Sequence, residues 1–442
     1  MLQKVFKFGG ASIKNADAVK NLHQILLRFS NEKLVLVFSA MGKTTNALEK
    51  LLQASRDEQT DLKNTLFEQV KAFHFDIVGE LFSKEALELL SPKLEFLFEQ
   101  LATDIELITL EYDKHYDATV SYGELLSTTI ISHYLLQQGL SVKLIDARKI
   151  ILTDDCFRAA NINWNKSCES IKKMAEVNSD SRFLITQGFI GGTLKQETTT
   201  LGREGSDFTA AILAYCLDAS EVTIWKDVPG LLNADPKRLM HSEKINHISY
   251  GEAIELAYYG ATVIHPKTVK PLQNGKIRLK VQSFLNPDLA PSLIDYSDES
   301  IINVPSFIIK EQQILMSISA RDFSFMNEHI LHKLLGHFVE MRIHINVMQT
   351  SALSLSVCFD EDIQKLKSLI KSLEDSFSIR YNSQLTLFTI RHYTQKLADS
   401  ITHKHTVLLE QRSRTTLQLV VESLDIPLIE MVMKDKYGLL RN

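Results

Sequence analysis

The chain has 442 residues, a length that predicts two or three domains rather than a single core. With 45% hydrophobic and 23% charged residues it has the composition of a soluble globular protein, and no apolar run approaches the ~20 residues needed to span a bilayer. The formal net charge of -5, with interspersed signs, excludes a basic stripe, so we expect no nucleic acid partner.

The N-terminus and the cysteines narrow the class further. Residues 1–7 lack the apolar core of a signal peptide, so we predict a cytoplasmic protein without a membrane segment. Cys156, Cys168, Cys216 and Cys358 are scattered without a CxxC pair or a Cys/His cluster. We therefore predict neither a metal site nor a disulfide framework, and interpret all four as small buried apolar side chains.

The first predicted strand, residues 5–8, ends in a double glycine. Open α/β sheets bind ligands at the carboxyl ends of their strands, which is where Lys7 lies. Gly9 and Gly10 allow the backbone to approach a phosphate closely, and lysine supplies a mobile point charge. A plain turn beside a solvated lysine is the alternative.

The same arrangement recurs after the second predicted strand. Residues 34–38 form a continuous apolar run that fits a strand buried on both faces, and the polar loop of residues 39–46 then leads into a helix. Further strands at 141–148 and 182–189, with helices between them, predict a mainly parallel sheet covered on both faces. A helix opens near Glu124, which is either a ligand-binding acid or an ordinary first-turn acid favoured by the helix dipole.

The central stretch, residues 198–207, reads TTTLGREGSD and leads into a helix. Unpaired amides at a helix start can hold phosphate or carboxylate oxygens, and Arg203 adds a planar donor fork suited to a carboxylate. Alternatively, Ser206 or Asp207 is simply the N-cap of the helix. A strand at 221–226 then leads into a charged loop that reaches Lys237, which is either a nucleotide-binding surface or a plain surface turn.

The predicted succession of strands and helices changes after residues 286–305, a stretch with several prolines that we interpret as a linker. Strands predicted at 314–319 and 386–390 each begin a β-α-β-β-α succession. Two such successive units indicate paired ferredoxin-like modules.

Six motifs occur in the order and spacing of the aspartate kinases: residues 7–10, 39–46, 123–128, 198–207, 225–230 and 260–266. The chain resembles that family over essentially its whole length. The resemblance implies an amino acid kinase catalytic domain at 1–290, a carbamate kinase-like open αβα sandwich with a mainly parallel sheet. It also implies a linker at 291–307 and tandem ACT regulatory domains at 308–442, which are ferredoxin-like.

The resemblance implies an ATP-dependent kinase that transfers the γ-phosphoryl group of ATP, with Mg²⁺, to the side-chain carboxylate of L-aspartate. The product, 4-phospho-L-aspartate, begins the biosynthesis of lysine, threonine and methionine. It further implies feedback inhibition by an end-product amino acid, lysine or threonine, and a homodimer formed through the ACT domains. The alternatives are an amino acid kinase with another acceptor and a non-catalytic amino acid sensor.

The residue roles implied by the family fall into four groups. Catalysis is expected from Lys7 and Asp207, and aspartate binding from Thr45, Glu124, Arg203 and Ser206. Nucleotide binding is expected from Lys7, Phe8, Gly9, Gly10, Ser39, Lys226, Asp227 and Lys237. Effector binding is expected from Ser324, Met326, Asn327, Ile345, Asn346 and Ser351, although Asn346 and Ser351 alternatively complete hairpin hydrogen bonds.

Several positions depart from the family pattern. Ala11 stands where Ser or Thr is usual, and Glu204 replaces a glycine. Lys226, Leu232 and Thr262 replace a threonine, a tyrosine and a lysine on the expected nucleotide side. The way in which the nucleotide is held is therefore less well defined by the sequence than the way in which aspartate is held.

Overall fold

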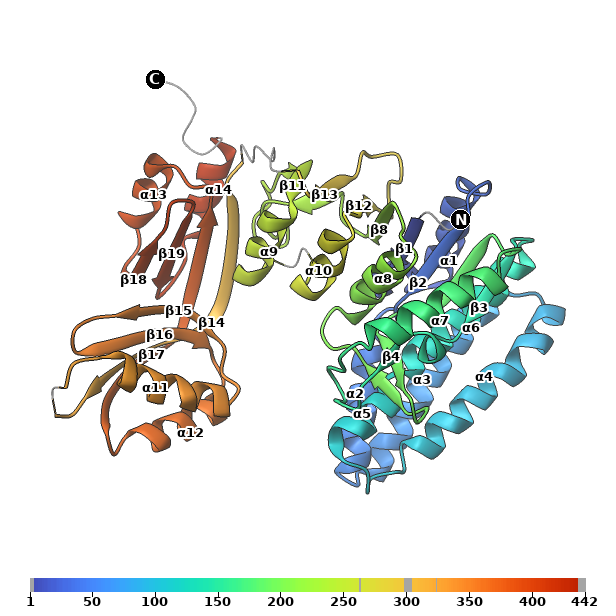
Figure 1. Cartoon of the computed structure of the whole chain (residues 1–442), viewed down its shortest axis with the longest axis horizontal. Helices are drawn as coiled ribbons and strands as arrows, with labels where there is room; N and C mark the ends of the chain where they lie inside the picture. Colours follow the sequence, from blue (N-terminus) through green and yellow to red (C-terminus); the bar gives the residue numbers. More distant parts are fainter. Residues whose placement is uncertain (1–3, 262–263, 298–303, 323, 436–442) are drawn as a thin grey trace. The chain divides into compact units, whose positions relative to one another are not determined.

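The computed structural model describes residues 4–261, 264–297, 304–322 and 324–435. The chain folds into two compact units, drawn in Figure 1. The first unit comprises residues 1–231, 246–254 and 263–300, and the second comprises 232–245, 255–262 and 301–442. Within the described ranges, no helix combines the length and the apolar character that crossing a bilayer requires.

The first unit is built on an eight-stranded sheet with the order β11-β13-β12-β8-β1-β2-β5-β3. Its strands are β1 (Lys4–Phe8), β2 (Leu34–Phe38), β3 (Val142–Ile145), β5 (Phe183–Gln187), β8 (Glu221–Lys226), β11 (His247–Ser249), β12 (Arg278–Ser283) and β13 (Ser292–Asp295). All neighbours pair in parallel except β12 and β13, which confirms the predicted mainly parallel sheet. The chain leaves β1 toward β2 and later returns beside β1 as β8, so the sheet has its switch point at β1.

Helices cover both faces of this sheet. They are α1 (Ala16–Leu27), α2 (Thr44–Arg56), α3 (Thr60–Leu81), α4 (Lys84–Asp104), α5 (Tyr112–Val120), α6 (Tyr122–Gln137), α7 (Trp164–Val177), α8 (Gly205–Cys216) and α10 (Pro266–Asn274), with short 3-10 turns at Gly10–Ile13 and Ala147–Lys149. The helix α9 (Tyr250–Tyr259) begins in this unit and belongs to the second from residue 255 on. Helices α2 to α5 all pack on α6, and form the blue and cyan helical layer in Figure 1.

Successive side chains of β1 point to opposite faces of the sheet. Phe6 packs against Phe29 just after α1, with ring centroids 4.9 Å apart, whereas the neighbouring Lys7 contacts Asp207 in α8. Helices α7 and α10 pack on α8, so these three helices share the Lys7 face. A small ladder of β4 (Leu152–Thr153), β6 (Ile190–Thr193) and β7 (Thr198–Thr200) completes the unit. Another pair, β9 (Leu231–Leu232) with β10 (Lys244–Ile245), begins at the end of this unit and belongs to the second from residue 232 on.

An aromatic stack fixes the end of β1. Phe8 is in register with Phe38 of β2 and Trp225 of β8. The Phe8 ring stacks on both neighbours, with centroids 5.3 Å from Phe38 and 5.8 Å from Trp225. All three side chains are buried, so the stack adds both apolar burial and ring contact at the strand end that carries Lys7.

The second unit has one six-stranded sheet with the order β15-β16-β14-β17-β19-β18, and all neighbouring strands in it are antiparallel. Its strands are β14 (Ser306–Ala320), β15 (Ile345–Thr350), β16 (Ser354–Asp360), β17 (Phe377–Arg391), β18 (Val407–Arg412) and β19 (Thr416–Val421). Its helices are α11 (Glu328–Glu340), α12 (Ile363–Leu373), α13 (Gln395–Thr402) and α14 (Ile426–Lys434).

The two predicted modules are interleaved rather than successive. Ile314, Met316 and Ile318 of β14 share one core with α11 and α12, whereas Phe307 of the same strand and Phe388 of β17 share another with α13 and α14. Each 15-residue strand therefore contributes to both modules, and the predicted strands at 314–319 and 386–390 are only halves of β14 and β17. The first helix of the second succession, for which the sequence prediction gave no bounds, is α13.

The predicted linker also differs from the structure. Residues 292–295 form β13, which pairs with β12 and β11 in the first sheet. In the second unit, Asn233 of the charged loop donates its side-chain amide to the Pro305 carbonyl at 2.9 Å, and its own carbonyl accepts from the Phe307 amide at 2.7 Å. The segment from 232 to 245 thus belongs to the second unit, because long-range backbone pairing outweighs its sequence position.

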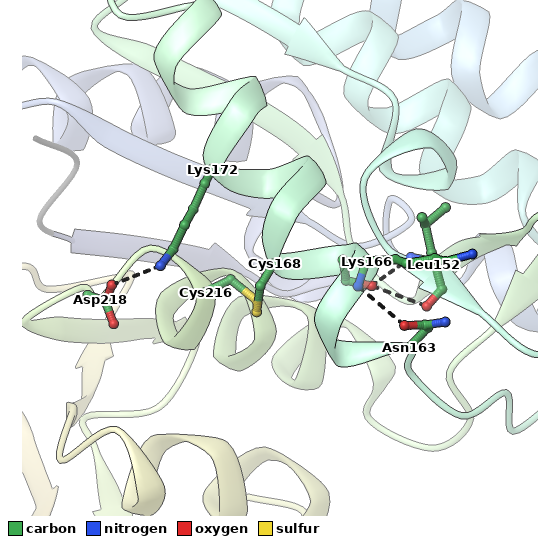
Figure 2. Close-up of a disulfide and its surroundings, with 8 residues drawn as sticks. Leu152, Asn163, Lys166, Cys168, Lys172, Cys216 and Asp218 are labelled. Atoms are coloured by element: carbon green, nitrogen blue, oxygen red, sulfur yellow. Dashed lines mark hydrogen bonds and ion pairs between the residues drawn. A yellow bond between two sulfur atoms is a disulfide. The ribbon is translucent and has the colours of Figure 1, made fainter.

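The prediction of unpaired cysteines is wrong for Cys168 and Cys216, which form a disulfide between α7 and α8. Figure 2 shows the bond beside the ion pair of Lys172 with Asp218, whose charged atoms lie 3.3 Å apart. A sequence separation of 48 residues left no local pattern to signal the pairing. Cys156 is exposed, contrary to the prediction of burial, and Cys358 is buried as predicted.

Removing this disulfide should destabilise the first unit. The Cys168→Ser variant loses a constraint that closes a loop of 48 residues, so we expect its free energy of unfolding to fall by about 2–4 kcal/mol. Urea unfolding followed by tryptophan fluorescence measures this, because Trp164 and Trp225 both lie in the first unit. The exposed Cys156→Ser variant is the control, and equal midpoints for the two variants would contradict the expectation.

Candidate active site

An ion pair joins the end of β1 to the start of α8. The Lys7 ammonium lies 2.7 Å from Asp207 Oδ1, and the two side chains are only 11% and 4% exposed. Burial alone would raise the pKa of Asp207, but the positive charges of Lys7 and Lys226 hold that pKa below its usual value. A lysine is thereby fixed in place at the carboxyl edge of the sheet, where parallel-sheet proteins bind their ligands.

The loop before α8 has an unusual backbone. Gly202 has φ of +79° and Glu204, at the N-cap position, has φ of +53°. No side chain caps the helix, so the alternative that Ser206 or Asp207 is simply the N-cap is not what the structure shows. Gly188 permits the close approach of the β5 exit, because a Cβ there would lie 2.5 Å from the Ser206 Cβ.

Glu124, in the first turn of α6, is a buried carboxylate with one oxygen unpaired. Its Oε1 accepts a hydrogen bond from the Ala40 amide at 3.0 Å, while Oε2 is buried and has no hydrogen-bond partner in the described part of the chain. Burial raises the pKa of Glu124 to about 8, although the Ala40 hydrogen bond and the charge of Lys7 act in the opposite direction. Such a group suits a cationic ligand.

These side chains line one cleft of about 560 Å³, which we call the main cleft. Eight of the predicted site residues are among its lining residues: Lys7, Ser39, Thr45, Glu124, Arg203, Ser206, Asp207 and Lys226. Lys7 and Arg203, 196 residues apart in sequence, therefore face the same cavity. Arg203 itself is exposed, in keeping with a place at the mouth.

The other predicted nucleotide residues are placed differently. Gly9 lies beside the site, since a Cβ on it would be 3.4 Å from the Lys7 ammonium. Phe8 is buried in the aromatic stack, and Gly10 packs closely on the loop after β2. Asp227 is exposed in the turn after β8, and Lys237 belongs to the second unit.

Four of the five atypical positions are placed by the structure, and Glu204 and Lys226 line the main cleft. Ala11 is exposed in the 3-10 turn after Gly10, and Leu232 belongs to β9. Thr262 lies outside the described residues.

Sequence reasoning missed three residues that line the main cleft, namely Tyr116, Arg158 and Phe189. Arg158 lies with its guanidinium over the Tyr116 ring, 4.5 Å from the centroid. Its backbone has φ of +66°, and that of Phe189 has φ of +67°. Neither feature follows from composition or periodicity, because both depend on how separate loops meet.

A fourth missed residue, Asp117 of α5, holds two of these loops together. It is fully buried and accepts hydrogen bonds from the Arg158 amide at 2.9 Å, the Thr200 amide at 2.8 Å and the Thr200 hydroxyl at 2.7 Å. Burial raises its pKa to about 6 despite these donors. Because Thr200 immediately precedes the 201–204 loop, Asp117 positions the segment that carries Arg203.

The predicted effector residues lie on the first ferredoxin-like module of the second unit. Asn346 is buried: its amide donates to Gln313 at 2.8 Å and to Asp360 at 2.9 Å, and its carbonyl oxygen accepts from Lys310 at 2.9 Å. Ser351 bonds to Ser354 in the turn between β15 and β16, as the alternative interpretation predicts.

The remaining effector residues surround the start of α11. Asn327 caps that helix, and the amide of Met326 donates to the Ala352 carbonyl at 2.9 Å. The Ser324 amide donates to the Asp322 carboxylate, and Ile345 begins β15.

Comparison with known proteins places this site in a family. The model of the amino acid kinase family matches residues 3–283. Aspartokinase 2, chloroplastic, of Arabidopsis thaliana is 30% identical over 411 residues, which cover 89% of this chain and 74% of the relative. Lysine-sensitive aspartokinase 3 of Escherichia coli (strain K12) is 32% identical over 363 residues, with 80% and 78% covered.

Solved structures agree with this placement. A complex of E. coli aspartokinase III with aspartate and ADP in the R-state aligns with a TM-score of 0.83 at 26% identity, covering 99% of each chain. The T-state of that enzyme with lysine and aspartate aligns with a TM-score of 0.80 at 25% identity, covering 98% of this chain and 99% of the other. The chain therefore belongs to the amino acid kinase family. Within that family it is a member of the aspartokinases, which confirms the predicted kinase fold with ACT-like modules.

The raised pKa of Glu124 makes folding stability depend on pH. Because the folded state favours the neutral acid up to about pH 8 while the ordinary pKa is 4.5, the contribution of Glu124 to stability is fully present below pH 4.5 and is lost as the pH rises through 8. The Glu124→Gln variant removes this contribution, whose upper bound is about 4–5 kcal/mol. Urea unfolding between pH 5 and pH 9 should therefore show a flatter profile for the variant.

The control for this measurement is the exposed Glu88→Gln variant, whose profile should follow that of the unaltered protein. Parallel profiles for all three proteins would contradict the assignment of Glu124.

Proposed function

We propose that the chain transfers the γ-phosphoryl group of ATP to the side-chain carboxylate of L-aspartate, giving 4-phospho-L-aspartate. The observation that carries the proposal is that Lys7, Glu124 and Arg203 line one cleft. Arg203 suits the α-carboxylate of aspartate and Glu124 suits its ammonium, and Lys7 in the same cleft suits the phosphoryl group that its side-chain carboxylate accepts. The membership in the aspartokinases supports the same reaction.

Lys7 is the cation for the transferring phosphoryl group. Phosphoryl transfer depends on positioning and charge neutralisation more than on covalent chemistry, and an ionised carboxylate acceptor needs no strong base. Asp207 holds the Lys7 ammonium at 2.7 Å and so fixes its position. Fixing the cation in advance avoids its reorganisation during the reaction.

The acceptor aspartate lies between Arg203 and Glu124 in this proposal. Arg203 binds the α-carboxylate through its planar donor fork, and the unpaired Oε2 of Glu124 binds the ammonium. Thr45 in the first turn of α2 and Ser206 in the first turn of α8 complete the pocket with hydroxyl groups. A dicarboxylate without an amino group leaves Glu124 unpaired, which explains selection for an amino acid.

The nucleotide is assigned to the strand ends on the other side of Lys7. Gly9 and Gly10 offer backbone amides, Ser39 and Lys226 line the cleft, and Phe8, Asp227 and Lys237 remain assigned by resemblance.

Across the described ranges no cluster of three or more His, Cys, Asp or Glu side chains is arranged to hold a metal. One carboxylate, Asp207, faces the phosphates, which fits a Mg²⁺ ion bound mainly by ATP oxygens.

The test is ADP release measured with aspartate, with hydroxylamine trapping the acyl phosphate. We expect turnover, and we expect Lys7→Ala to lower kcat by roughly 10²–10³-fold because a fixed positive charge is lost. The exposed Lys50→Ala variant should leave kcat unchanged. A preference for glutamate or a nucleotide would establish another acceptor, and the absence of ADP release would leave an amino acid sensor.

Regulation by lysine or threonine through the second unit extends the proposal, together with a homodimer formed by the ACT modules. Its support is the lysine complex of the E. coli enzyme and the polar group formed by Asn346, Lys310 and Asp360. The domain limits at 290 and 308 remain proposals. They are adjusted by assigning β13 to the first unit and residues 232–245 to the second. The cytoplasmic location stays a prediction, since the relatives include chloroplastic and bacterial proteins.

Calorimetry with lysine and with threonine tests the regulation. We expect saturable heat from one of them, lysine in the first place, and about tenfold weaker binding in the Asn346→Ser variant, which loses a side-chain amide worth roughly one hydrogen bond to a charged ligand. The exposed Ser368→Ala variant on α12 is the control. Heat from neither amino acid would contradict the effector assignment.

A further inference from the structure

A second cleft of about 420 Å³ lies in the first unit, at the place where α7, α8 and α10 meet. We call it the aromatic cleft and define it by Trp164, Phe208, Tyr215, Lys267, Lys270 and Asn274. It shares no lining residue with the main cleft, and the proposed kinase reaction uses none of its side chains.

Three aromatic rings form its walls. Phe208 and Tyr215 are seven residues apart on α8 and so lie on one face of that helix. Trp164, at the start of α7, meets Tyr215 with ring centroids 5.4 Å apart and Phe208 with centroids 6.4 Å apart, both edge to face. Rings in this arrangement leave faces on which a planar group can stack.

The rim of the aromatic cleft is cationic. Lys267 and Lys270 are three residues apart on α10, on one face, and both are exposed. None of the lining residues is acidic, and Asn274 adds an amide at the end of the same helix. Rings beside two ammonium groups with no neighbouring carboxylate in the lining favour a ligand that is both planar and anionic.

The disulfide fixes the two aromatic walls to each other. Cys168 lies one turn after Trp164 on α7, and Cys216 directly follows Tyr215 on α8. The cross-link therefore holds the rings at a set separation before any ligand binds. A preformed cleft loses less conformational entropy on binding than one that must be assembled.

The aromatic cleft also adjoins the catalytic machinery. Phe208 immediately follows Asp207, the partner of Lys7, in the first turn of α8. His265, which caps α10 next to Lys267, lies close enough to Glu204 and Arg203 for their charges to act on it. A ligand on Phe208 and Lys267 therefore contacts both helices that flank the 201–204 loop.

We propose that the aromatic cleft is a binding site for a planar aromatic anion, a ring that carries a phosphate or a carboxylate. The ligand ring stacks on an aromatic face that the edge-to-face contact of Trp164 and Tyr215 leaves open, and the anionic group meets Lys267 and Lys270. The site is separate from the main cleft, to which ATP and aspartate are assigned. A ligand bound in it contacts α8, the helix that positions Asp207.

Tryptophan fluorescence tests this directly. The chain has two tryptophans, so a Trp225→Phe background leaves Trp164 as the single reporter and keeps an aromatic ring in the β1 stack. Phenyl phosphate is the probe, with inorganic phosphate and phenol as its separate halves. We expect a saturable change in Trp164 emission with phenyl phosphate, and at least tenfold weaker binding of either half. Benzoate in place of phenyl phosphate distinguishes a carboxylate from a phosphate site.

Variants of the lysines locate the probe. The Lys267→Ala/Lys270→Ala double variant should weaken phenyl phosphate binding at least tenfold, whereas the exposed Lys276→Ala variant, which lies beyond α10, should not. A Lys7→Ala variant in the same background should bind the probe normally. The proposal is overturned by the absence of a saturable signal, by equal affinities for the double variant and the Lys276→Ala control, or by loss of the signal in Lys7→Ala. None of these readings depends on turnover, so failure here is distinct from failure of the kinase assignment.

Discussion

The desolvated ion pair of Lys7 with Asp207 is the contact on which the site depends. It bridges the central strand β1 and the first turn of α8, two elements separated by 200 residues in sequence. A buried charge without a partner is costly, so each residue holds the other in place. The stack of Phe8 on Phe38 and Trp225 fixes the strand end from the opposite face. The position of the lysine is therefore determined on both sides of the sheet.

Around this pair the chain keeps a second acidic group, Glu124, in a place where its ionisation is costly. Glu124 is buried with one unpaired oxygen, and its pKa of about 8 expresses the energy of ionising it there. An ammonium entering the main cleft reverses that cost, because it supplies the missing partner. The ligand thus contributes to the stability of its own site. Asp117, through its hydrogen bonds to Thr200, fixes the start of the 201–204 loop without being a predicted ligand contact itself.

Much of the first unit was predictable from local pattern. The apolar run at β2 and the glycines after β1 identified the strand ends, and Lys7, Glu124 and Arg203, which the sequence predicted as site residues, all line the main cleft. The failures depend on contacts between distant segments. The pairing of Cys168 with Cys216 follows from the packing of α7 on α8, and Arg158 enters the cleft through a left-handed backbone held by Asp117. The N-terminal halves of β14 and β17 were missed because the polar runs 310–313 and 382–384 interrupt the apolar pattern within each strand.

The length of β14 and β17 has a mechanical consequence. Each strand runs without interruption through the cores of both ferredoxin-like modules, and the two pair with each other along nearly their whole length, past one irregular stretch between Lys310 and Leu315. A pair of hydrogen-bonded strands resists shear far better than a flexible tether. A change in the twist of these strands within one module is therefore transmitted to the other module. The two modules of the second unit form one stiff body and are not joined by a flexible linker.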